Sequence, residues 1–185
     1  MASSFLFVAD SSSGSNYPST ISARLRNFPS DPSPLYGTII AMKNIAKNVI
    51  PGMRYRDALA AIEWLQKAFG FEKHAVYMGE GNIVGHAQMA FGNGMIMLSS
   101  VDNGSKASAM MAQPDEIGNR ETQSAYLVVS DCEPIYATAK AAGAEMIHDL
   151  ATMDYGGKSF TCRDLEGHIW SIGEYDPWAS HETQS

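Results

Sequence analysis

Residues 54–70, RYRDALAAIEWLQKAFG, decide the fold. They close a strand-like run over 49–56, and Asp57 is placed to cap a helix, because its side chain accepts a hydrogen bond from the first turn. Apolar residues recur at helical spacing across 58–69, which predicts an amphipathic helix. Gly70 ends that helix, since glycine adopts the left-handed conformation at low cost. The stretch therefore predicts a strand followed directly by a helix.

Three strand-like runs complete this first unit, which reads as β-α-β-β-β. They cover 71–78, 83–91 and 95–101, with an Asn93-Gly94 turn before the last. The same order then restarts. The second half has a strand at 124–129, a cap at Asp131, a helix at 133–142 stopped by Gly143, and strands at 144–149, 158–163 and 168–174.

A constant offset relates the two halves. Asp57 and Asp131 lie 74 residues apart, and Gly94 and Gly167 lie 73 apart. One such unit has a curved sheet whose second face it cannot cover, so two units side by side form a pocket. The expected fold is α+β, with two βαβββ modules whose curved mixed sheets form a cup-shaped cavity.

The chain divides into four expected segments. Residues 1–41 are rich in Ser and Pro and are interpreted as a flexible extension upstream of a natural start at Met42. A transit-type peptide is the alternative interpretation. Residues 48–101 form the first module, 102–122 a linker with a short helix near Met110, and 123–178 the second module.

Composition excludes several classes of function. The net charge is −7 and no cluster of Lys and Arg is larger than Arg54 with Arg56, so no nucleic-acid surface is expected. No apolar run approaches the roughly 20 residues that a membrane helix needs. Cys132 and Cys162 lack metal spacing and accompany no secretory signal. Reduced thiols in a cytoplasmic protein are expected.

Several motifs resemble those of the vicinal-oxygen-chelate superfamily, which includes glyoxalases, bleomycin-resistance proteins and dioxygenases. Residues 54–57, 61–65 and 68–71 are similar to the opening of a family module. Asp164-Leu165-Glu166-Gly167 resembles its closing Asp-Pro-Asp-Gly motif, with leucine in place of proline. Residues 86–88 and 91–98 resemble most the PhnB-like branch. The resemblance implies the fold but no particular substrate.

The resemblance also implies where metal ligands belong. In metalloenzymes of this superfamily a first-strand His precedes the cap Asp by seven residues, and a fourth-strand Glu follows the closing-motif Asp by seven. The corresponding positions here, with their repeat equivalents, are Ile50, Met97, Ser124 and Ser171. None is an imidazole or a carboxylate, so we expect no metal and no other cofactor.

Strand alternation separates core residues from cup residues. The residues expected to line the cup and bind a ligand are Arg54, His86, Gln88, Met95, Met97, Ser124, Tyr126, Thr161 and Ser171. Methionine and tyrosine side chains suit flat organic ligands. His86 is the only histidine expected there, and it is the one candidate general base.

Two hypotheses for function remain open from the sequence. The first is a metal-free protein that sequesters a small organic ligand or antibiotic, in the manner of bleomycin-resistance proteins. The second is a metal-independent isomerase or lyase that uses His86 as general base. The resemblance also implies a homodimer, because such proteins commonly complete their cups between chains.

Overall fold

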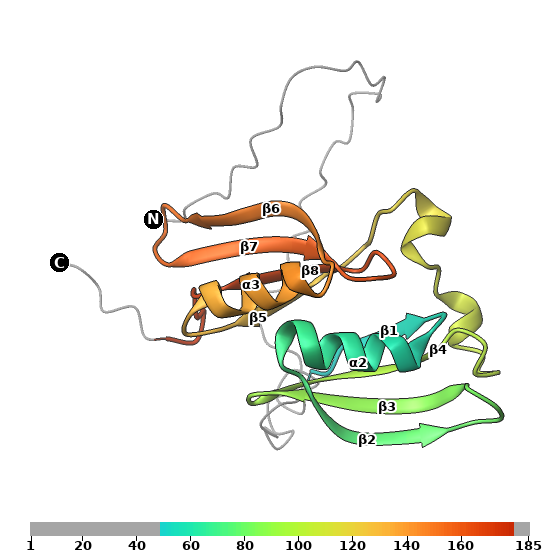
Figure 1. Ribbon diagram of the computed structural model, residues 1–185. Helices are drawn as coiled ribbons and strands as arrows, with labels where there is room; N and C mark the ends of the chain where they lie inside the picture. The colour runs from blue at the N-terminus through green and yellow to red at the C-terminus, as the bar shows by residue number, and fades with distance from the viewer. Residues whose placement is uncertain (1–48, 180–185) are drawn as a thin grey trace, which may run out of the picture. The chain divides into compact units, whose positions relative to one another are not determined.

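The computed structural model describes residues 49–179 (Figure 1). The expectations for the extension at 1–41 fall outside these residues. The described chain contains two four-stranded sheets and two α-helices, with a pair of short 3₁₀ turns between the two halves. The α+β fold with two βαβββ modules is thereby confirmed.

In the first module, strand β1 precedes helix α2, and three further strands complete the sheet. The bounds are β1 Gly52–Tyr55, α2 Ala58–Phe69, β2 Glu72–Met78, β3 Val84–Phe91 and β4 Gly94–Ser100. The strand order is β1-β4-β3-β2, with β1 parallel to β4 and the other pairs antiparallel.

The second module repeats this plan. The 3₁₀ turns η1 Ser108–Met110 and η2 Pro114–Ile117 lead to β5 Ala125–Val128, α3 Cys132–Ala141, β6 Glu145–Thr152, β7 Lys158–Arg163 and β8 Ile169–Gly173. Its strand order, β5-β8-β7-β6, matches the first. Strand β6 extends three residues beyond the expected end at 149, because its pairing with β7 continues to Thr152.

Helix α2 begins and ends where the sequence predicts. The Asp57 side chain accepts a hydrogen bond from the Ala60 amide, and Gly70 is left-handed with φ 81°. The amide of Phe71 donates back to the Leu65 carbonyl, which completes the C-terminal cap. One face of the helix is buried, and it carries Ala58, Ala61, Ile62, Trp64, Leu65, Ala68 and Phe69.

The pairing registers confirm the duplication. Gly52 pairs with Met97 in the first sheet, and Tyr126 pairs with Ser171 in the second, each member displaced by 74 residues. Even a side-chain contact is repeated at this offset. The Val84 amide donates to Ser100 Oγ, and the amide 74 residues later, that of Lys158, donates to the Glu174 carboxylate.

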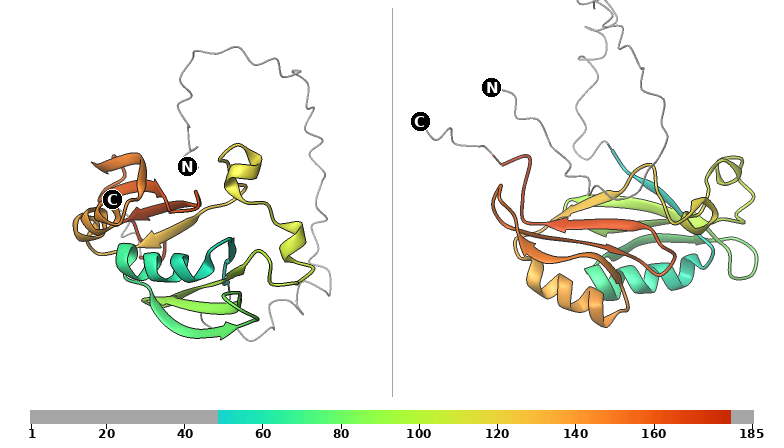
Figure 2. Two further views of the ribbon diagram at one scale, coloured as in Figure 1. Left: turned by 45° about the vertical axis from the view of Figure 1, so that its right-hand side comes forward. Right: turned by 90° about the horizontal axis from the view of Figure 1, so that it is seen from above.

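The two modules pack through their helices, which lie side by side in Figures 1 and 2. Trp64 Nε1 donates to the Ala142 carbonyl at 2.9 Å, and the Thr138 hydroxyl donates to the Ala68 carbonyl at 2.7 Å. Trp170 of β8 is fully buried against Phe69, with ring centroids 5.4 Å apart. The hydrophobic core is therefore shared between the modules.

Candidate functional site

Each sheet has one face covered by the core and a second face, here called its open face, that carries half-buried or exposed side chains. In β3, Ala87 and Met89 are fully buried, whereas His86 and Gln88 are half-buried. In β7, Phe160 and Cys162 are fully buried and Thr161 is half-buried. This alternation matches the one expected from the sequence.

The open face of the first module brings several expected ligand-binding residues together. Gln88 lies opposite Met97 in the β3–β4 ladder, and Met95 lies two residues before it on the same face. Gln88 Nε2 lies 3.3 Å from His86 Nε2. The His86 ring in turn stacks on Tyr77, at 6.1 Å and an interplanar angle of 28°. This face is a polar and aromatic surface that the core does not use.

The open face of the second module has a different chemistry. Ser171 lies between Tyr126 and Thr161, and the hydroxyls of Ser171 and Thr161 are 3.3 Å apart. The Tyr126 ring lies across Gly173, and its hydroxyl donates to the Tyr175 carbonyl at 3.2 Å. Three hydroxyl groups and an aromatic ring are thus presented here.

The four positions that correspond to family metal ligands do not fit a divalent ion. Ile50, Met97, Ser124 and Ser171 offer one aliphatic chain, one thioether and two hydroxyls, and none is the imidazole or carboxylate such an ion requires. Within residues 49–179 no three His, Cys, Asp or Glu side chains are grouped in a way that could hold a metal ion.

A cavity of about 660 Å³ lies at the junction of the modules. Ile50 and Ser124, which are equivalent in the repeat, both line it, so it marks where the starts of the two modules meet. Of the residues expected to bind a ligand, only Ser124 lines this cavity, and the others lie on the open faces. Its remaining lining is mixed, with Met53, Met110, Met111, Ile117, Arg120, Glu121, His168 and Ile169 among its residues.

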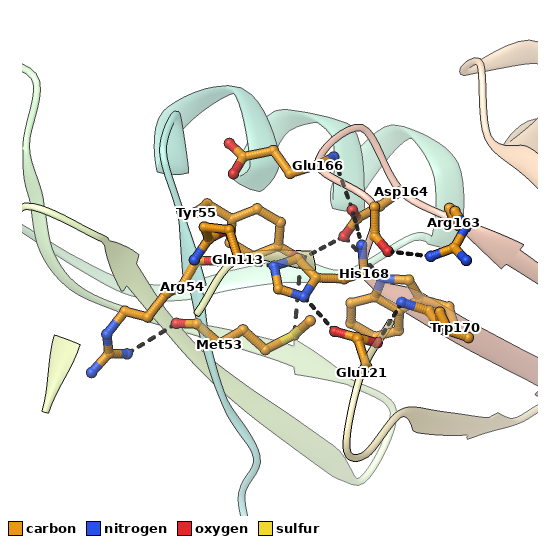
Figure 3. A network of polar contacts seen from close by, with 12 residues as sticks. Met53, Arg54, Tyr55, Gln113, Glu121, Arg163, Asp164, Glu166, His168 and Trp170 are labelled. Atoms are coloured by element: carbon orange, nitrogen blue, oxygen red, sulfur yellow. Dashed lines mark hydrogen bonds and ion pairs between the residues drawn. The ribbon is translucent and has the colours of Figure 1, made fainter. Parts of the chain in front are cut away.

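A buried histidine forms one wall of this cavity and joins the two modules (Figure 3). His168 Nε2 lies 2.9 Å from the Arg54 carbonyl, and Nδ1 lies 2.6 Å from Glu121 Oε1. A carbonyl only accepts, so Nε2 carries a proton. Nδ1 faces a carboxylate and needs a proton as well. The geometry therefore favours an imidazolium paired with the Glu121 carboxylate.

Electrostatics agrees with this protonation. Burial lowers the pKa of His168, but the hydrogen bond to Glu121, the charge of Asp164 and the Arg54 carbonyl together outweigh it, so the pKa is raised. Glu121 also accepts from the Ile169 amide at 2.7 Å. Both carboxylate oxygens are thus used at the junction.

Asp164 of the closing motif is the second centre of this network (Figure 3). Its Oδ2 accepts from the Tyr55 hydroxyl at 2.7 Å and from Trp170 Nε1 at 3.0 Å. Its Oδ1 accepts from the amides of Glu166 and His168, each at 3.0 Å. Burial and the Asp164 charge raise the pKa of Tyr55 well above its usual value, so Tyr55 stays protonated as the donor.

The closing-motif turn also covers the open edge of β1. Glu166 accepts from the amides of Arg56 and Asp57, while His168 donates to the Arg54 carbonyl. An exposed strand edge offers unpaired backbone groups to other chains, and this turn pairs three such groups in and just after the end of β1. The sequence identified the motif but missed this role, because nothing local connects Glu166 or His168 to β1.

Neither cysteine lies in surroundings that favour a reactive thiolate. Burial raises the pKa of Cys132 to about 11 and that of Cys162 to about 12, with nearby carboxylates adding to both effects. Both thiols are buried and free.

The fold and the open faces define the class of protein, a paired βαβββ module protein with a ligand-sized cavity where the modules meet. Residues 48–172 match the model of the Glyoxalase/Bleomycin resistance protein/Dioxygenase superfamily. The chain belongs to this superfamily. Among residues 49–179, no helix is both long and apolar enough to cross a membrane.

Solved structures with the same fold include TioX from Micromonospora sp. ML1, which is 25% identical, has a TM-score of 0.54, and matches over 69% of this chain and 98% of its own. UcmS2 is 15% identical with a TM-score of 0.55, over 72% of this chain and all of its own (100%). The fosfomycin resistance protein FosX from Listeria monocytogenes, solved with Mn(II) and a sulfate ion, is 13% identical with a TM-score of 0.53, over 72% of this chain and 93% of its own. None of the curated proteins matches the chain's sequence significantly.

Proposed function

We propose that this protein binds and sequesters a small organic ligand, such as an antibiotic, without a metal ion. The observation that carries the proposal is the open face of the first module, where Tyr77, His86, Gln88 and Met97 are adjacent and take no part in the core. The stacked rings of Tyr77 and His86 and the thioether of Met97 suit a flat ligand. The amide of Gln88 offers a hydrogen bond that fixes the ligand's orientation. The proposal includes the PhnB-like branch, a cytoplasmic location and a homodimer.

Binding is favoured over catalysis by the surroundings of His86. With Gln88 Nε2 as donor, the nearest ring nitrogen of His86 accepts that hydrogen bond and is not free to take a proton from a substrate. A general base is also commonly oriented by a third polar group. No carboxylate within residues 49–179 is hydrogen-bonded to His86.

A ligand screen tests the proposal. The full chain is screened by thermal shift and then by isothermal titration against flat aromatic compounds, antibiotics among them. We expect saturable binding with no chemical change in the recovered ligand. Elemental analysis of the purified protein should find no stoichiometric divalent metal, and a metal found at one ion per chain contradicts the metal-free part.

The alternative is a metal-independent isomerase or lyase with His86 as general base. It predicts that His86→Ala abolishes turnover of a bound compound while the fold is retained. His74→Ala is the matched control, because His74 is an exposed histidine on the neighbouring strand β2. Turnover that persists in His86→Ala rejects this alternative. If no compound binds in the screen and a compound is turned over in a way that depends on His86, sequestration is rejected instead.

A further inference from the structure

Arg54 is a half-buried cation on the open face of the first module, and within residues 49–179 it has no carboxylate partner. The basic side chains Arg56, Lys140 and Lys158 differ, since each forms an ion pair on the surface. Burying part of a charge without a carboxylate partner costs free energy, which an anionic ligand at Arg54 would offset.

The Arg54 guanidinium is held in place by neutral groups alone. Nε donates to Ser108 Oγ at 2.9 Å, and Nη1 donates to the Met53 carbonyl at 2.9 Å. Ser108 donates to Asn103 Oδ1 at 2.9 Å, and Asn103 donates to the buried Ser99 at 2.8 Å. This chain of hydrogen bonds orients the side chain without neutralising its charge.

The two bonds leave part of the guanidinium available. Of the five N–H donors of an arginine, only Nε and one on Nη1 have a partner among residues 49–179. With Nε already used, the edge formed by Nη1 and Nη2 is the one left to bind a carboxylate or a phosphate with two parallel hydrogen bonds. Arg54 is therefore preorganised to bind an anion.

The neighbourhood of Arg54 continues into the surface already assigned to the ligand. Arg54 pairs with Ser99 across β1 and β4, and Met97 lies two residues before Ser99 on the same face, opposite Gln88. Asn103 is hydrogen-bonded to both Ser99 and Ser108, next to Arg54 on this face. Arg54, Met97, Gln88 and the stack of His86 on Tyr77 thus lie on one continuous face of the sheet.

We propose that Arg54 binds an anionic group of the ligand, a carboxylate or a phosphate, while an aromatic body lies over Met97 and Gln88. This deepens the proposed function and rests on it. The chain as a whole carries a net charge of −7, whereas this site is locally cationic.

A matched series of naphthalene probes tests the proposal on the full chain. The ring is kept constant and the head group is varied among naphthoate, naphthyl phosphate, neutral naphthamide and cationic naphthylmethylammonium. Binding is followed by the fluorescence of the ring, for the wild type, Arg54→Gln and the control Arg163→Gln. Arg163 is also half-buried and also donates to a main-chain carbonyl, that of Gly167, but lies in the second module.

We expect an anionic probe to bind wild type more tightly than naphthamide, and Arg54→Gln to weaken that probe roughly tenfold or more, as for a charge-assisted hydrogen bond. Naphthamide binding should stay unchanged in Arg54→Gln, and Arg163→Gln should behave as wild type. The better of the two anionic probes identifies the head group. An anionic preference that survives Arg54→Gln, or a cationic preference in wild type, overturns the Arg54 assignment alone. Failure of every probe to bind overturns the proposed function itself.

Discussion

At the scale of single residues, the junction depends on one proton. His168 contacts a backbone carbonyl of the first module through one nitrogen and the Glu121 carboxylate of the linker through the other. Only the doubly protonated ring donates to both. The charge state of one side chain is therefore coupled to the packing of the two modules.

The pH dependence of stability follows from this coupling. The folded pKa of His168 is raised above the unfolded value of about 6.5, so folding takes up a proton. Its contribution to stability is complete below that unfolded value and is lost as the pH rises through the folded pKa. We expect the melting temperature of wild type to fall across this window. Glu121→Gln should remove most of this fall, because the amide does not favour the charged ring. If the melting temperature of Glu121→Gln falls by as much as that of wild type, the pH dependence does not come from the pairing of His168 with Glu121.

Gln113 gives a second prediction at this scale. Its side chain is buried, and neither its Nε2 nor its Oε1 atom has a hydrogen-bond partner among the described residues. Burying an unsatisfied amide is unfavourable, so Gln113→Met, which keeps the shape, should raise the free energy of unfolding by about 1–2 kcal/mol. Urea denaturation measures the change. A loss of stability in Gln113→Met would show that the amide has a partner, such as a bound water.

At the scale of helices and strands, local pattern was enough to predict the fold. Helix α2 and strand β7 have the predicted bounds because their caps and alternation are encoded in neighbouring residues. The partners of Arg54 were not predictable in this way. Ser108 is 54 residues away and His168 is 114 away, so only the folded chain brings them together. The sequence could nominate Arg54 and His86 from their strand face, but it could not show that one lacks a carboxylate and the other stacks on Tyr77.

The second open face gives a prediction at the scale of strands. A Cβ atom at Gly173 would collide with the Tyr126 ring, whereas one at Gly52, which is the repeat equivalent of Tyr126, would meet nothing within 4 Å. Gly173→Ala should therefore displace the ring and cost about 1–3 kcal/mol of stability. Gly52→Ala is the control and should cost less. Thermal unfolding compares the two, and near-ultraviolet circular dichroism reports on the tyrosine. Equal melting temperatures would mean that the ring moves aside freely.

At the scale of the whole molecule, the two modules are joined too closely to be independent domains. Trp170 of the second module packs on Phe69 and Phe71 of the first, with centroids 5.4 and 5.8 Å apart. Tyr55 donates to Asp164 in the buried junction. Each module thus completes its core and satisfies its polar groups with side chains of the other. Independent domains would each have a core of their own.

This shared core predicts a single cooperative unfolding transition. We expect the calorimetric and van't Hoff enthalpies of the full chain to agree, as they do for a two-state protein. Phe71→Ala removes a ring from the first module and should cost about 3–5 kcal/mol, as for other buried aromatic truncations. Because the ring packs against Trp170, the loss should lower one common melting temperature.

The fluorescence of Trp170, in a variant with Trp64→Phe and Trp178→Phe, follows the second module, while circular dichroism follows the whole chain. Two separate transitions, with the Trp170 signal unmoved by Phe71→Ala, would mean that the duplicated modules have remained separate folding units. One transition would mean that the junction, with its histidine and its aspartate, has made them one.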